Sequence, residues 1–369
     1  MNLVNGAIRT VPVWLSILLG FLVFSTSEVK PEAKDFSGFL GNDPSKIAGP
    51  DECGECHKAE MHVWRETGHS KTFKVFTRKK QAKEIAGNMG IKRVKKAEAC
   101  VTCHFTSGKK RNKVKAIAGI SCESCHGPAK DWLKIHGEYG GKNVTREHET
   151  PEHKAKRLTA IKQAGMIRPG DLYRLAANCY QCHIVSDEQL VNVGEHRTRS
   201  DDFELVSWSL GEIRHKFLRS EGKKNEEVSP ERKRMLYVVG KALDLEYGLR
   251  ALAKATSEGT YVTATTKHVR RVVDTLQAID AANPIQEIKE ILKIIKGVEL
   301  KIGHEAALVE AAETIASATR ELANTRHGSQ MTALDPILPQ PEQYKGKPGG
   351  PPERVTAQDS PSLAAMPDR

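Results

Sequence analysis

Residues 119–128 read Gly-Ile-Ser-Cys-Glu-Ser-Cys-His-Gly-Pro, and the pattern at their centre, Cys-x-x-Cys-His, occurs four times in this chain of 369 residues. The four copies lie at 53–57, 100–104, 122–126 and 179–183 and contain all eight cysteines. The pattern is the attachment signature of c-type haem, because two thiols one helical turn apart can add to the two vinyl groups of one porphyrin edge. The adjoining histidine then binds the iron. The sequence therefore predicts four covalently bound haem c groups, attached through Cys53, Cys56, Cys100, Cys103, Cys122, Cys125, Cys179 and Cys182, with His57, His104, His126 and His183 as proximal iron ligands.

Paired cysteines also build zinc sites, thioredoxin-like redox centres and disulfide frameworks. None of these requires a histidine directly after the second cysteine. With 14 histidines in the chain, four such coincidences have a probability on the order of 10⁻⁶. Haem attachment is therefore favoured, zinc remains the main alternative, and no cysteine is left over for a disulfide.

The first 28 residues carry an export signal. Arg9 precedes an apolar run at 11–24, whose length of about 14 residues fits a signal peptide better than a spanning helix of about 20. No Ala-x-Ala cleavage site follows, so an uncleaved N-terminal anchor stays open beside a cleaved signal peptide. Both alternatives predict a periplasmic or exported protein, and in bacteria haem is attached in that compartment.

The chain is expected to be mostly α-helical, and its composition excludes collagen-like, fully disordered and polytopic membrane proteins. Residues 47–220 hold the motifs and predict a tetrahaem domain of short helices, in which the haems form much of the core. Apolar residues at 230–327 recur at three/four spacing, which predicts an antiparallel helical bundle. The proline-rich tail, 328–369, lacks periodicity and is predicted to be disordered.

The second axial ligand of each iron decides whether a haem carries electrons or binds a substrate. The haem segment holds three methionines but seven histidines outside the motifs, which favours bis-histidine haems of low potential. His69 lies 12 residues after His57, about 18 Å along a continuous helix, so it should ligate another haem. The same reasoning holds for His136 after His126. The favoured distal ligands are His69, His136, His215 and His196; His62, His148 and His153 are less favoured, and His268, His304 and His327 are expected on the surface.

The residues around two motifs resemble a known family. The first motif is followed by Trp64 and by Thr67-Gly68-His69-Ser70-Lys71, and the third lies in 119–128 with His136 ten residues later. Over about 47–220, this resembles the tetrahaem cytochrome c-554 family. The resemblance implies near-parallel stacked haems and periplasmic electron transfer, in nitrifiers as the acceptor from hydroxylamine oxidoreductase. It also implies that His69 and His136 are distal ligands and that the haem on Cys100, Cys103 and His104 is five-coordinate.

The resemblance has two gaps. The last haem segment departs from the family pattern around Glu195-His196 and a helix expected at 203–219, so the distal partner of His183 is not transferred. The helices of 230–327 have no counterpart in the family.

Two functions are compatible with these features. The first is an electron carrier that passes electrons between redox partners through bis-histidine haems, with no catalytic residue. The alternative is a multihaem oxidoreductase that acts on a small nitrogen or sulfur compound at a five-coordinate haem, and the carrier is preferred because no acid/base constellation is recognisable.

Partners are suggested by the charge pattern. The formal net charge of +11 is concentrated in 71–115, which holds 15 Lys and Arg against two acidic residues. This segment is either a docking face for an acidic redox protein or a solvated loop that balances haem propionates. Nucleic acid is not expected as a partner, and membrane contact only through an N-terminal anchor. The 230–327 bundle is open as a docking or dimerisation element.

Overall fold

The computed structural model describes residues 42–200 and 203–352. The chain divides into the units Met1–Phe36 and Ser37–Arg369, and every described residue belongs to the second. The predicted signal peptide or anchor at 1–28 therefore lies outside the described residues, as does the end of the predicted tail from 353. Within the described part, no helix combines the length and the apolar character needed to cross a membrane.

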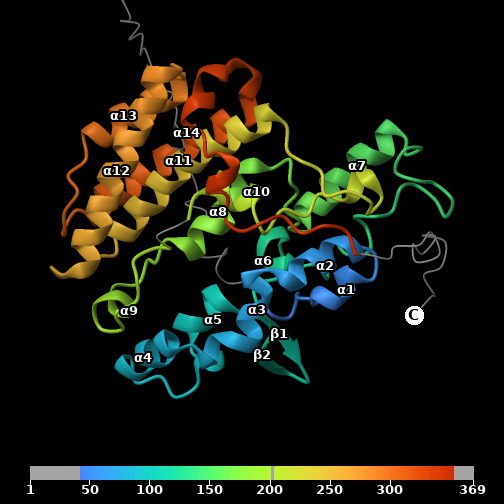
Figure 1. Ribbon diagram of the computed structural model, residues 1–369, viewed down its shortest axis with the longest axis horizontal. Helices are drawn as coiled ribbons and strands as arrows, with labels where there is room; N and C mark the ends of the chain where they lie inside the picture. The colour runs from blue at the N-terminus through green and yellow to red at the C-terminus, as the bar shows by residue number, and fades with distance from the viewer. Residues whose placement is uncertain (1–41, 201–202, 353–369) are drawn as a thin grey trace, which may run out of the picture. The chain divides into compact units, whose positions relative to one another are not determined.

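The described part of the chain is mostly α-helical, as predicted (Figure 1). The helices of the motif-bearing region are α1 (Pro50–Gly54), α2 (Lys58–Glu66), α3 (Gly68–Val75), α4 (Lys80–Asn88), α5 (Glu98–His104), α6 (Cys122–His126), α7 (Pro151–Gln163), α8 (Leu172–His183), α9 (Glu188–Asn192) and α10 (Leu205–Leu210). Short 3-10 turns are η2 (Phe76–Arg78), η3 (Val94–Lys96) and η4 (Leu218–Ser220). Strands β1 (Thr106–Lys110) and β2 (Lys113–Ala118) form an antiparallel hairpin. The C-terminal helices are α11 (Pro230–Leu252), α12 (Thr260–Ala282), α13 (Gln286–Lys296) and α14 (Glu305–Thr325), followed by the 3-10 turns η5 (Gly328–Gln330), η6 (Thr332–Ile337) and η7 (Pro341–Gln343).

Each Cys-x-x-Cys-His motif forms about one turn of helix. Three of the helices end on the motif histidine, at His104, His126 and His183. In the first motif the turn closes through a 2.9 Å bond from the amide of His57 to the carbonyl of Cys53. Residues three apart on a helix lie on the same face, so both cysteines of a motif point to the same side.

Two expected helices end earlier than the sequence suggests. The continuous helix assumed between His57 and His69 breaks at Thr67, whose hydroxyl caps α3 by accepting from the amide of Ser70 at 3.2 Å. The helix expected at 203–219 stops at Leu210. Gly211 follows, and a side chain there would collide with the carbonyl oxygen of Lys345, which approaches to 2.1 Å from an ideal Cβ.

The hydrophobic core is built around α11, which packs against α8, α10, α12 and α14 and is buried on most of its surface. One continuous cluster of buried residues includes Tyr180 of α8, Val206 of α10, Leu245 of α11, Leu276 of α12 and Ile315 of α14. The last haem motif and the C-terminal helices therefore share a core, and the expected boundary between 220 and 230 does not separate two cores.

One expected surface residue is buried in this core. His268 is 5% exposed and its Nε2 lies 2.7 Å from Oδ1 of Asp244, itself 4% exposed. The expectation of a surface position is wrong because His268 falls on the same helical face as Val272 and Leu276.

The described part of the tail is ordered, which corrects the prediction of disorder from 328 on. Met331, Leu334 and Leu338 are buried against the bundle. The following segment, 343–349, runs across α10, where the amide of Lys345 donates to Ser207 at 3.1 Å. The side chain of Asn225 also holds the carbonyl of Gly349 at 2.9 Å. A few apolar anchors and backbone pairing thus order a sequence without helical period.

Candidate haem-binding site

The four motifs line one cavity of about 4650 Å³ between the helices of the motif-bearing region. A pocket for a single small molecule or cofactor measures roughly 300–1,000 Å³, so this cavity has the volume of several such pockets. All eight motif cysteines line it, together with the four motif histidines and His69, His136, His196 and His215. The less favoured His62, His148 and His153 do not line it.

Eight histidine rings form four facing pairs in this cavity. The ring-centroid distances are 6.2 Å for His57–His136, 6.1 Å for His69–His183, 6.4 Å for His104–His196 and 6.3 Å for His126–His215. Two imidazoles that bind one metal from opposite sides, at metal–nitrogen distances of about 2 Å, place their ring centroids about 6.2 Å apart. Every motif histidine thus has a second histidine at the separation that an iron ion between them requires.

The structure places each favoured distal histidine opposite a motif histidine from another part of the chain. His69 does not face His57, as the helix argument requires, but faces His183, whose partner the sequence left unidentified. His196 faces His104, where the resemblance implied an open position. Their binding to iron stays a prediction, but the arrangement that it needs is present.

Hydrogen bonds orient these rings. The Nδ1 atoms of four rings lie within reach of backbone carbonyls: His126 with Ile167 at 2.9 Å, His136 with Leu133 at 2.6 Å, His196 with Arg197 at 2.7 Å and His215 with Ile213 at 2.6 Å. Because a carbonyl can only accept, Nδ1 carries the proton and Nε2 keeps the lone pair that a metal needs. The Nδ1 of His183 meets the hydroxyl of Ser200 at 2.9 Å.

Burial keeps several of these imidazoles neutral. Removal from water lowers the pKa of His104 and of His126 to about 4, and it also lowers the pKa of His69. The neutral form is the one that binds iron. Aromatic side chains complete the surroundings: Phe76 stacks on His104 at 4.0 Å and Phe203 on His183 at 4.1 Å.

The motifs follow one another in space in an order that differs from the sequence. Helix α1, which carries the start of the first motif, packs against α6 of the third, and α5 of the second motif packs against α8 of the fourth. Asn178 of α8 donates to the carbonyl of Cys125 at 2.8 Å and so joins the third and fourth motifs. The spatial order is therefore first, third, fourth, second.

Glu123, inside the third motif, is a residue whose role the sequence did not reveal. Its side chain is fully buried and accepts from the amides of Ala48, Gly49 and Ala129 at 2.8, 2.7 and 2.7 Å. It thereby fixes the segment before the first motif against the third. A charged residue between two motif cysteines gives no sequence signal that separates a buried clamp from a solvated side chain.

The segment after the second motif forms the β1–β2 hairpin. Arg111 and Asn112 take positive φ angles of 49° and 58° at its tip, as a tight hairpin turn requires. Lys109, Lys110 and Arg111 are exposed there. They do not line the cavity.

Comparison with known proteins gives a partial match. Residues 52–127, which contain the first three motifs, match the family described as cytochrome c554 and c-prime. Cytochrome c-554 of Nitrosomonas europaea is 26% identical over 144 residues, which span 37% of this chain and 57% of that relative. No solved structure matches.

Proposed function

Because the segment around the first three motifs belongs to the cytochrome c554 family, we propose that this protein is an exported tetrahaem cytochrome that carries electrons between redox partners. The observation that carries the proposal is the set of four histidine pairs at 6.1–6.4 Å, each containing one motif histidine and all in one cavity. Each pair accounts for both axial positions of one iron.

The residues have simple roles in such a carrier. The motif cysteines would hold haem through thioether bonds, and bound haem supplies a one-electron couple. The histidine pairs would hold the iron of each bound haem from both sides, which would favour a low potential and would leave no place for a substrate. Aromatic rings pack against three of these pairs and limit the access of water: Phe203 and Trp132 are buried and Phe76 is half-buried.

With a haem on each motif, the spatial order of the motifs would give the domain one end for electron entry and one for electron exit. The first and the second motif lie at opposite ends of the series, and the third and fourth lie between them. An electron that enters at one end would pass every haem before it leaves at the other.

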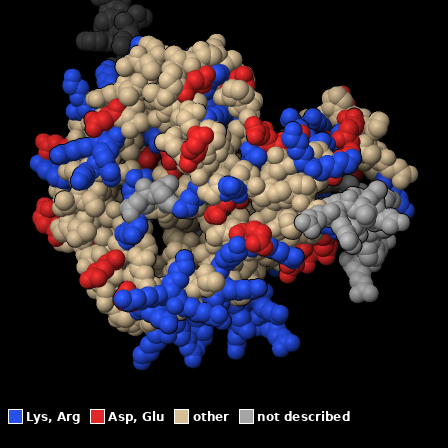
Figure 2. All heavy atoms as spheres, viewed as in Figure 1, with Lys and Arg blue, Asp and Glu red and all other residues tan. Residues whose placement is uncertain are grey.

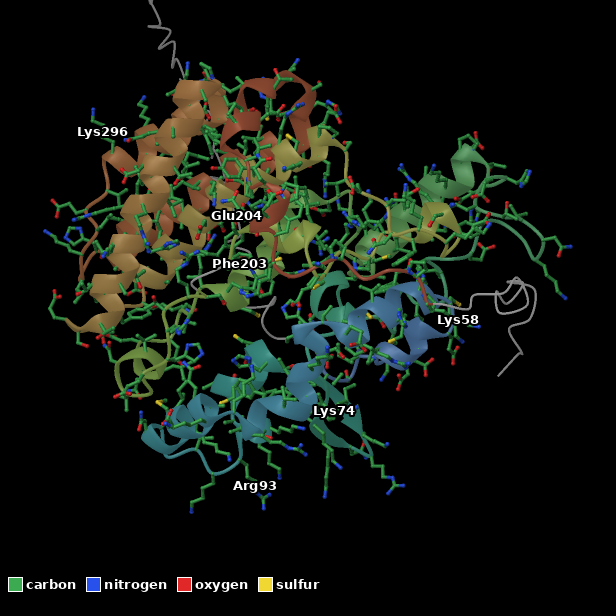
Figure 3. The ribbon with its side chains drawn as sticks, in the orientation of Figure 1. Lys58, Lys74, Arg93, Phe203, Glu204 and Lys296 are labelled. Carbon is green, nitrogen blue, oxygen red and sulfur yellow. The ribbon has the colours of Figure 1, made fainter. Side chains whose placement is uncertain are left out.

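The end at the second motif lies beside the basic segment 71–115. Apart from half-buried Lys95, its lysines and arginines are exposed, and Figure 2 shows them gathered over α3, α4 and the hairpin. Lys74 and Arg93, labelled in Figure 3, belong to this surface. The two acidic residues of the segment are Glu84, 3.6 Å from Lys80, and Glu98. We propose that this surface docks an acidic redox protein, whose approach it accelerates by electrostatic attraction.

The alternative, an oxidoreductase with an open haem at His104, is less well supported. The ring of His196 faces His104 at 6.4 Å, and Phe76 covers it at 4.0 Å. A small nitrogen or sulfur compound would have to displace His196 before it could bind.

Haem stoichiometry and spin state test the proposal. The pyridine-haemochrome assay should give four haems per chain, and EPR of the oxidised protein should show only low-spin ferric iron that does not change with nitric oxide. A different stoichiometry would contradict the tetrahaem assignment. A high-spin signal that shifts with small ligands would support the oxidoreductase.

The proposed compartment is the periplasm or beyond. Haem attachment takes place there in bacteria, and the sequence of 1–28 directs export. Cell fractionation with mass spectrometry of the mature N-terminus would separate a cleaved signal peptide from an anchor. Recovery of the haem-loaded protein from the cytoplasm would contradict export.

A further inference from the structure

Three buried hydrogen-bond donors have no partner among the described residues and line the same cavity. They are Nε1 of Trp132, Nε of Arg199 and Nε of Arg214. A buried polar group without a partner costs free energy, and native proteins rarely leave one unpaired. Donors that face a cofactor cavity therefore point to acceptors on the cofactor.

Each donor lies beside a different histidine pair. Trp132 packs edge-on against His136 with 5.3 Å between ring centroids, next to the first motif. Arg199 precedes Ser200, which bonds to His183 of the fourth motif at 2.9 Å. Arg214 precedes His215, the ring that faces His126 of the third motif.

Among the described residues, neither arginine has a carboxylate in close contact. The guanidinium of Arg199 donates to the backbone carbonyl of Phe203 at 3.1 Å. That of Arg214, with 14% of its side chain exposed, reaches Glu227 only at 3.7 Å, and Glu227 is 80% exposed. Both arginines are half-buried and the Nε atom of each is buried. A cation held away from water without a close carboxylate is usually matched by an anion.

The chemistry of haem supplies that anion, because each haem carries two propionate carboxylates. We propose that Trp132, Arg199 and Arg214 bind the propionates of the haems on the first, fourth and third motifs. The two guanidinium groups also raise the reduction potentials of the fourth and third haems. Reduction adds one negative charge to a haem, so a buried cation beside it stabilises the reduced form.

The haem on the second motif differs from the other three. Lys79 and Lys96 line its part of the cavity and are exposed. Solvent screens exposed charges, so these lysines influence a potential less than a half-buried arginine does. The inference rests on the proposed four haems and adds the residues that hold their carboxylates.

Redox titration of the haem-loaded Arg199→Gln and Arg214→Gln variants tests the proposal. In each variant the ferric/ferrous equilibrium of one haem should shift about tenfold toward the ferric form, which lowers its potential by about 59 mV. Arg199→Lys and Arg214→Lys keep the charge and should recover most of the shift. Arg219→Gln, an exposed arginine at the rim of the same cavity, is the matched control and should leave all four potentials in place.

A second measurement tests the proposal even if the glutamine variants do not incorporate haem. Resonance Raman propionate-bending bands should shift between the unaltered protein, Trp132→Phe and the two lysine variants. Unchanged potentials together with unchanged bands, in variants that keep four low-spin haems, would overturn the inference. A count other than four haems in the unaltered protein would instead overturn the proposed function.

Discussion

The motif-bearing region and the C-terminal helices are held together in different ways. In α11–α14 and the helices packed on them, a continuous cluster of buried aliphatic residues surrounds Leu243, Leu245 and Leu249. Between α1 and α7 the buried apolar clusters are small: Ala59 and Val63 with Phe217, and Trp132 with Ala129 and Ile161. They flank the 4650 Å³ cavity rather than fill it.

The contrast shows that two parts of a chain with few aromatic residues can be stabilised by different means. The bundle obtains its stability from apolar area removed from water. The part from α1 to α7 has only small apolar clusters of its own. We therefore expect this part to depend on bound haem, in the way that small metal domains depend on their metal.

Preventing haem attachment should have the largest effect. With every motif cysteine changed to serine, hydrogen exchange should show loss of protection in α1–α6 and retained protection in α11 and α14. Equal loss in both regions would show that the bundle also depends on haem, and equal retention would show that neither does.

A cavity created in the core of α11–α14 should destabilise the C-terminal helices. Leu245 is fully buried, and Leu245→Ala should lower the free energy of unfolding by about 2–5 kcal/mol in denaturant titrations. The haem absorption spectrum should stay unchanged before the transition. Val309→Ala, at a position 38% exposed, is the control and should cost far less.

The Glu123 clamp should matter for the motif-bearing region. Glu123→Gln removes the negative charge that accepts three hydrogen bonds from backbone amides. The variant should lower the free energy of unfolding by about 1.5–3 kcal/mol. We expect the lost stability to appear as faster exchange in α1 and α6 and not in α14. Glu55→Gln, exposed inside the first motif, provides the control. Equal effects of the two variants would contradict the clamp.

Removal of His196 should change spectroscopy more than stability. His196→Ala should convert one of four low-spin signals to high spin and allow nitric oxide to bind, because the position opposite His104 opens. Exposed His62 lies away from the cavity, and His62→Ala should leave the spectrum unchanged. A wholly low-spin His196→Ala protein would show that another group ligates that iron.

The attachment residues could be predicted from sequence because their chemistry fixes their spacing. The four histidines favoured as distal ligands do face the motif histidines, and their binding to iron stays a prediction. The pairing itself could not be predicted, since Thr67 turns α3 and so directs His69 toward His183, over 100 positions later.

Other features depended on contacts that the sequence pattern does not display. Glu123 meets amides more than 70 positions earlier, and Met331 and Leu338 anchor a tail without periodicity. The burial of His268 could have been predicted from the helical periodicity of α12, because His268 lies on the apolar face of that helix. Its partner Asp244, on another helix, was not.

The histidine pairs also have a consequence for the order in which the sites can be completed during export. Each pair joins positions about 80–110 residues apart, so coordination depends on contacts of high sequence separation. A chain exported from its N-terminus presents His136 first, then His183 and His196, and His215 last. If each motif binds haem as proposed, the third haem would be attached before the fourth but would gain its second ligand last, when His215 is exported.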